Sequence, residues 1–188
     1  MAKRTPKSVP ALVDFMALVT GKHDSTLAHI ARRAREAGHL SQAGHGPGAA
    51  KATSRDAATI LLVSMATEAA VHAGPVADAL ADLTPDEENT KEVAGYRFKA
   101  KDPVKMVTEI IDGLRRGEAA MDQIGITQVT VGPYVSISPK FADGAAPDIH
   151  WSFDVGRETK AIKRYQELPR KSSGGMGGIR QHETCPIE

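Results

Sequence analysis

Cysteine is almost absent from this sequence, because Cys185 is the only one among its 188 residues. One thiol cannot form a disulfide within the chain, and it cannot build a zinc site from several cysteines. Proteins with so few cysteines fit a reducing compartment. The sequence therefore predicts a cytoplasmic location.

Long hydrophobic runs are missing as well. No stretch approaches the roughly 18 apolar residues that cross a bilayer as a helix, so we expect no membrane contact. The chain begins with a basic segment, MAKRTPKSVP. An amphipathic segment without a cleavage site follows it, which is not the pattern of a signal peptide.

Aromatic residues are scarce, at 4% of the chain, although 41% of its residues are hydrophobic. The chain can therefore bury a core, and this core must be mainly aliphatic and rich in alanine. A length of 188 residues fits one large domain or two small ones.

The overall charge of +1 conceals a segregation of charges along the chain. Residues 1–60 carry a net charge of +5, with nine Lys/Arg against four Asp/Glu, and residues 156–188 carry +3. Residues 61–95 carry −6, and residues 96–155 carry −1. The two basic ends favour a polyanionic partner.

Residues 24–66 have the clearest organisation, which is a helix, a glycine-rich loop and a second helix. Apolar residues recur at helical spacing in the first helix: Leu27, Ile30, Ala31 and Ala34. Gly38 is predicted to end this helix. The second helix opens at Thr53, and Asp56 stands at capping-box spacing. Arginines lie opposite the apolar stripe, an arrangement typical of a helix-turn-helix DNA-binding unit.

The rest of the N-terminal half is also predicted to be helical, over residues 9–20, 54–73 and 75–83. The first of these helices packs under the two-helix unit, so we expect no apolar face there to remain free for dimerisation. Residues 1–83 would form a helical DNA-binding domain. The acidic, turn-rich residues 84–95 would form a linker.

Elements of two types are predicted after the linker. A helix runs from Asp102-Pro103 to about Arg116. Short β-branched or alternating segments predict strands at 96–100, 126–131, 134–140 and 148–154. Residues 96–168 would form a domain that oligomerises or binds a protein partner. The Gly/Ser-rich residues 169–188 are predicted to be disordered.

The predicted fold class is therefore α+β. A helical, helix-turn-helix-like N-terminal domain would precede a small antiparallel β-meander packed on one helix, and a disordered C-terminal tail would follow.

Patterns for enzymatic chemistry are not found. Gly44, Gly46 and Gly48 follow a helix and lack the spacing of a dinucleotide-binding turn, and no P-loop adjacency of Gly, Lys and Thr occurs. His39 and His45 have no carboxylate or cysteine at metal-ligand spacing. His150, near Asp148 and Asp154, is favoured as a surface histidine over a general base. We expect no catalytic site, no metal and no cofactor.

Two segments of the N-terminal unit resemble known proteins: R-R-A-R-E-A-G-H-L at 32–40 and T-S-R-D-A-A at 53–58. Together with the glycine-rich loop between them, they are similar to helix-turn-helix proteins of bacteriophages and mobile elements, of the repressor or small-terminase type. The resemblance implies DNA binding and oligomerisation.

The predicted DNA contacts are basic residues of the N-terminal arm, the first helix, the loop and the start of the second helix: Lys3, Arg4, Lys7, Arg32, Arg33, Arg35, His39, Lys51 and Arg55. Three aromatic residues of the meander are predicted to form an oligomer interface: Tyr134, Trp151 and Phe153.

The resulting hypothesis is a non-enzymatic DNA-binding protein, first of all a transcriptional regulator of phage or prophage type. A DNA-recognition small subunit of a packaging machine is the second interpretation. The third is a protein-binding adaptor whose arginines form a solvated helix face.

Overall fold

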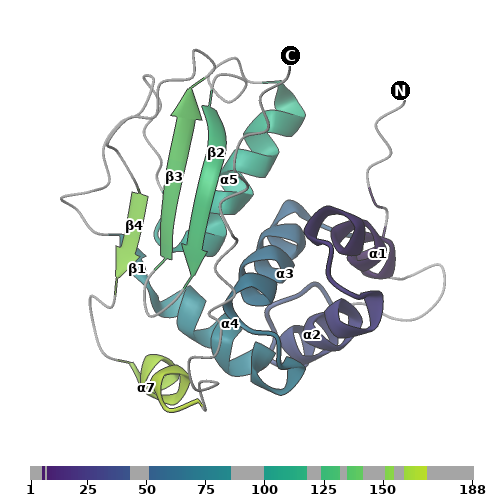
Figure 1. The fold of residues 1–188 in the computed structure, drawn as a ribbon, viewed down its shortest axis with the longest axis vertical. Helices are drawn as coiled ribbons and strands as arrows, with labels where there is room; N and C mark the ends of the chain where they lie inside the picture. Colours follow the sequence, from purple (N-terminus) through teal and green to yellow (C-terminus); the bar gives the residue numbers. More distant parts are fainter. Residues whose placement is uncertain are drawn as a thin grey trace, which may run out of the picture.

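A computed structural model describes residues 6, 8–42, 51–85, 100–117, 124–131, 135–141, 151–154 and 159–168. For residues 124–131, 135–141, 151–154 and 165–166 it describes the backbone only. The elements in chain order are α1 (Val9–Thr20), α2 (Asp24–Glu36), α3 (Ser54–Ala66), the short 3-10 helix η2 (Ala70–His72), α4 (Ala73–Asp82), β1 (Thr84–Pro85), α5 (Pro103–Arg116), β2 (Ile124–Val131), β3 (Val135–Phe141), β4 (Trp151–Asp154) and α7 (Lys160–Gln166) (Figure 1).

The ends of α1 and α2 are set by local signals. The Ser8 side chain accepts a hydrogen bond from the Ala11 N–H at the start of α1, and Gly21 ends this helix with a φ of 67°. Beyond α2, Gly38 has a φ of 87°. The N–H of His39 reaches back to the carbonyl of Ala34, which closes the last turn. Gly38 therefore ends the helix, as its sequence position predicts.

Two further helix starts follow the sequence closely. Thr53 and Asp56 form the predicted capping box at α3, with each side chain accepting a hydrogen bond from the other's backbone N–H. At α5 the Asp102 side chain accepts from the Lys105 N–H, Pro103 occupies the first turn and Gly117 ends the helix. The predicted helix from 102–103 to 116 is confirmed.

The prediction of one long helix over residues 54–73 is wrong. α3 ends at Ala66, because Thr67 adopts an extended backbone conformation with φ −148° and ψ 143°. α4 then starts at Ala73 and runs through Gly74 and Pro75. Proline fits the first turn of a helix, where its missing N–H leaves no bond unmade. The Gly74-Pro75 pair, which lies between the predicted helices 54–73 and 75–83, therefore belongs to the first turn of α4.

α3 is the central helix of the molecule. It packs against α1, α2, α4 and α5, and Figure 1 shows it between α5 and the α1–α2 pair. Its buried residues lie on every side of the helix: Ser54, Asp56, Ala58, Thr59, Ile60, Leu62, Val63 and Ser64. A helix that is buried all round is typical of the middle of a core.

The predicted fold class is wrong. Of the residues placed with their side chains, 72% are helical, and β1 is the one short strand among them. The main neighbour of α5 is α3, so this helix belongs to the helical core. The part of the chain that is placed with its side chains is therefore mainly helical.

Backbone pairing describes a sheet with the order β1–β4–β3–β2 and antiparallel neighbours. Its first strand, β1, directly follows α4, and pairs with β4 through Thr84 opposite Asp154. The sheet thus takes a strand from the segment that was predicted to be linker.

One buried cluster extends across the predicted domain boundary. Its members come from α1, α2, α3 and α4, and also from α5 and α7, where they include Met106, Val107, Ile110 and Ile162. The division into residues 1–83, 84–95, 96–168 and 169–188 stays a prediction, since residues 86–99 and 169–188 lie outside the described part. The shared core nevertheless argues that the two parts are stabilised by each other.

Candidate functional site

The outer face of α2 presents two arginines to solvent. Arg32 and Arg33 are both exposed, and each donates a hydrogen bond of 2.9 Å to a different carboxylate oxygen of Glu36. The hydrogen bond from Arg32, followed by the one from Arg33, lowers the pKa of Glu36 below its ordinary value of 4.5. Two positive charges and one negative charge thus share this surface.

Arg35 lies differently from the other two arginines. It is only partly exposed, and its Nε is buried without a hydrogen-bond partner among the described residues. Its backbone carbonyl accepts a hydrogen bond of 3.2 Å from the side chain of Gln42. Arg35 therefore belongs to the packed end of α2, although a long side chain of this kind can still present its head group to water.

Lys51 and Arg55 are exposed on either side of Thr53, at the start of α3. Hydrogen bonds from the N–H and the hydroxyl of Ser41 to the Asp56 carboxylate, at 2.8 and 2.9 Å, hold this start against the segment that follows α2. The start of α3 therefore presents a second pair of exposed basic residues, and it is tied to the segment that follows α2.

His39 contacts another side chain of the protein, that of Asp78. Its Nε2 lies 2.6 Å from Oδ1 of Asp78 on α4, and its side chain is partly buried. This pair joins the end of α2 to α4. In this arrangement His39 is a packing residue, and the structure does not bring it to the arginine face.

The geometry of a helix-turn-helix unit is not found at α2 and α3. In such a unit a short turn joins the helices, and the second helix enters the major groove. Here the residues between Glu36 and Ser54 are far too many for a short turn, and α3 is buried by its neighbours. α3 cannot reach a groove, so the predicted helix-turn-helix-like domain is wrong in this respect.

Several predicted site residues lie outside the described residues: Lys3, Arg4, Lys7 and Tyr134. Trp151 and Phe153 lie in β4, for which the backbone alone is described. His45 and the glycines of the loop over 43–50 are also outside.

A polar cluster that sequence reasoning missed joins α3 to α5. The buried Ser54 hydroxyl donates to the carboxylate of Asp112, and Nη1 of Arg115 donates to the Ser54 oxygen at 3.1 Å. The partners are 58 and 61 residues apart in sequence, so no local pattern could reveal them. The cluster satisfies a polar group at a helix contact, and each of its members has that structural use.

Within the described residues, histidines, cysteines and carboxylates nowhere gather in groups of three or more that could hold a metal ion. None of the helices described there has the length and apolar character needed to cross a bilayer. The candidate site is therefore a charged surface, formed by the exposed residues of α2 and of the start of α3.

Comparisons of the chain with protein-family models, with curated proteins and with solved structures find no match.

Proposed function

We propose that this chain is a non-enzymatic, cytoplasmic DNA-binding protein that contacts phosphates through the outer face of α2 and the start of α3. The observation that supports the proposal is the exposure of four cations on α2 and around the start of α3: Arg32, Arg33, Lys51 and Arg55. Exposed arginines and lysines on helix faces are the groups that contact a nucleic-acid backbone.

Binding of this kind reads the backbone more than the base sequence. α3 is buried, and the contacts would come from a helix face and a helix start on the surface. Among the roles open to such a protein, regulation of transcription remains our first proposal.

A protein-binding adaptor is the second candidate, and a specific observation favours it. Glu36 already pairs with both Arg32 and Arg33, so these arginines have an intramolecular partner when no DNA is present. On a solvated helix face such pairs contribute little to stability and need no ligand.

The salt dependence of DNA affinity separates the two candidates. We expect the full chain to bind duplex DNA in fluorescence anisotropy with an affinity that falls steeply with salt. The double variant Arg32→Ala, Arg33→Ala should bind more weakly, with a log–log slope reduced by about 2, because each lost phosphate contact removes about one unit. The matched control is Lys101→Ala, Lys160→Ala, which removes the same charge from exposed positions on other parts of the surface.

Glu36→Gln provides the opposite change. It releases both arginines from their carboxylate, so DNA affinity should rise, and it should rise more than in Glu68→Gln, which removes an exposed carboxylate elsewhere. Equal affinities for the parent, the double alanine variant and Glu36→Gln would leave the adaptor as the better function.

A further inference from the structure

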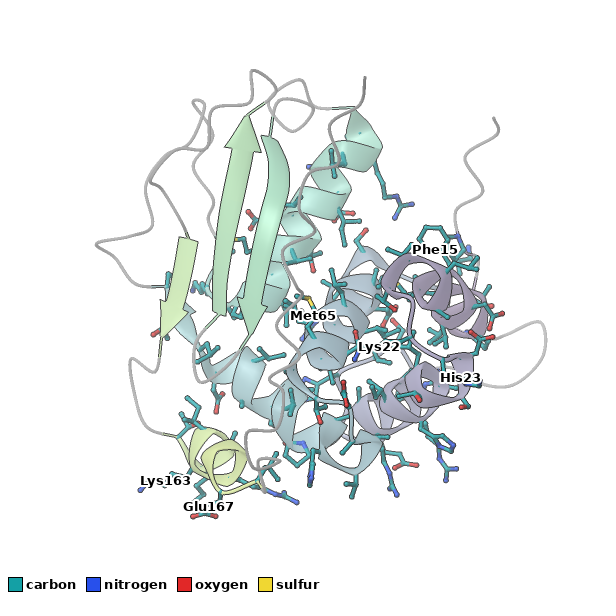
Figure 2. All side chains as sticks on the ribbon, viewed as in Figure 1. Phe15, Lys22, His23, Met65, Lys163 and Glu167 are labelled. Atoms are coloured by element: carbon teal, nitrogen blue, oxygen red, sulfur yellow. The ribbon has the colours of Figure 1, made fainter. Side chains whose placement is uncertain are left out.

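α1 is apolar on both of its faces, and only one of them is covered. Its inner face carries the buried residues Val9, Leu12, Val13, Met16 and Ala17. On the outer face, Phe15, Leu18 and Val19 are 47%, 84% and 60% exposed. Figure 2 shows Phe15 on the side of α1 that points away from α2.

These exposed residues form a continuous stripe. Phe15 is three residues before Leu18 and four before Val19, the spacing that places side chains on one helix face. Ala11 and Asp14, both exposed, continue the stripe towards the start of the helix. The expectation that the N-terminal helices have no apolar face left is therefore wrong, and we call residues 11, 14, 15, 18 and 19 the outer face of α1.

The charge of the outer face decides which kind of partner fits it. Asp14 is the only charged residue in α1, and the helix contains no lysine or arginine. Helices that lie on membranes carry basic residues beside their apolar face, and nucleic acid needs basic contacts. An apolar protein surface is the partner with matching chemistry.

The size of the outer face points to a weak, symmetric contact. The three large side chains expose roughly 300–400 Å² per copy, comparable to the largest apolar patch of a typical monomer, a patch that is often functional. Two such faces bury well under the ~1,200 Å² of a standard stable interface. A patch that is almost uniformly apolar can cover a second copy of itself, as the two-fold contacts of homodimers do.

We propose that two copies of this chain associate reversibly through the outer faces of α1, which cross antiparallel with Leu18 close to the two-fold axis. The antiparallel direction keeps the two Asp14 carboxylates apart on opposite sides of the axis, whereas a parallel pair would bring them together. Because α1 packs against α2, the pairing would also fix the two α2 faces relative to each other.

Mass measurement without DNA tests this proposal independently of the proposed function. By light scattering over about two decades of micromolar concentration, the mass of the full chain should rise from 20.0 kDa towards twice that value. Leu18→Glu should remain monomeric at every concentration, with an unchanged circular dichroism spectrum because Leu18 is exposed in the monomer. The matched control is Val71→Glu, at a residue that is 65% exposed in η2, and it should associate like the parent.

A cross-link locates the contact. In a Cys185→Ser background, Leu18→Cys should form a disulfide-linked dimer when oxidised glutathione accepts the two electrons and protons of the paired thiols. Val71→Cys in the same background should form far less of it. A monomeric parent, a Leu18→Glu variant that associates like the parent, or equal cross-linking at both positions would overturn the proposal.

Discussion

Asp56 holds together two segments that are fifteen residues apart. Its buried carboxylate accepts hydrogen bonds from the N–H and hydroxyl groups of both Ser41 and Thr53. The same residue therefore caps α3 and ties the segment after α2 to it. Any basic residue at the start of α3 depends on this carboxylate for its position.

Replacement of this carboxylate should cost more than the loss of an ordinary cap. We expect Asp56→Ala to lower the free energy of unfolding by about 2–3 kcal/mol, since a lost cap costs about 1 kcal/mol and buried donors without partners cost more. Urea denaturation measures the difference. The control Asp24→Ala, at an exposed residue in the first turn of α2, should change the free energy by at most about 0.5 kcal/mol. Equal effects of the two substitutions would contradict the role assigned to Asp56.

The sequence predicts one of the two contacts of Asp56, the one with Thr53, and does not predict the one with Ser41. The capping box is a local pattern, since Thr53 and Asp56 are three residues apart, and it was read correctly. The contact with Ser41 depends on where the segment after α2 lies relative to α3, and no periodic pattern in the sequence indicates that position. The same limit applies to the pair of His39 and Asp78, which are 39 residues apart in the sequence.

Two glycines at helix ends, Gly21 and Gly74, have opposite effects on the stability of the protein. Gly21 ends α1 in the left-handed region, with a φ of 67°. Gly74 lies in the first turn of α4, close to α2, and is buried there. A Cβ atom at Gly74 would lie 3.4 Å from Cβ of Ala37 and 3.7 Å from the carbonyl oxygen of Arg33, which are ordinary contact distances.

The same substitution at these glycines should therefore change stability in opposite directions. Gly21→Ala should lower the free energy of unfolding by about 1 kcal/mol, because a side chain strains the left-handed conformation. Gly74→Ala should raise it by about 0.5 kcal/mol, because alanine loses less backbone entropy in a helix. Urea denaturation of both variants checks the signs. A destabilised Gly74→Ala variant would mean that α2 and α4 are packed too closely for a methyl group.

The extent of α3 and its burial were the least predictable features among the helices. The sequence indicated one stripe, at Ala57, Ile60, Leu61 and Met65, which suits a helix with one covered face. In the structure small polar residues are buried as well, among them Thr59 and Ser64, and the Ser64 hydroxyl donates to the Leu61 carbonyl. Because such residues count as polar in a periodicity, the pattern underestimates how completely a central helix is enclosed.

At the scale of the whole molecule, α5 shows what an amphipathic pattern can and cannot predict. Val104, Val107 and Ile110 are buried and join the cluster that contains the residues of α3, whereas Leu114 on the same helix is 44% exposed. An amphipathic pattern indicates that one face of a helix is buried, but it does not indicate which other element buries that face. The division into separate domains depends on such an assignment and on the acidic composition of residues 84–95, and it stays a prediction.

The shared core predicts that the chain unfolds as one cooperative unit. Trp151, the only tryptophan, lies in β4, which pairs with β1 directly after α4, while most of the helical signal comes from α1 to α5. Tryptophan fluorescence and far-ultraviolet circular dichroism should therefore give the same urea midpoint, since coincident probes are the mark of a two-state transition.

Met106 is fully buried in α5, so Met106→Ala should lower the free energy of unfolding by about 2–5 kcal/mol and move both transitions together. Lys101→Ala, at an exposed residue just before α5, should have little effect and serves as the control. If residues 96–168 instead fold as an independent unit, the fluorescence transition would separate from the helical one, and Met106→Ala would shift the fluorescence alone.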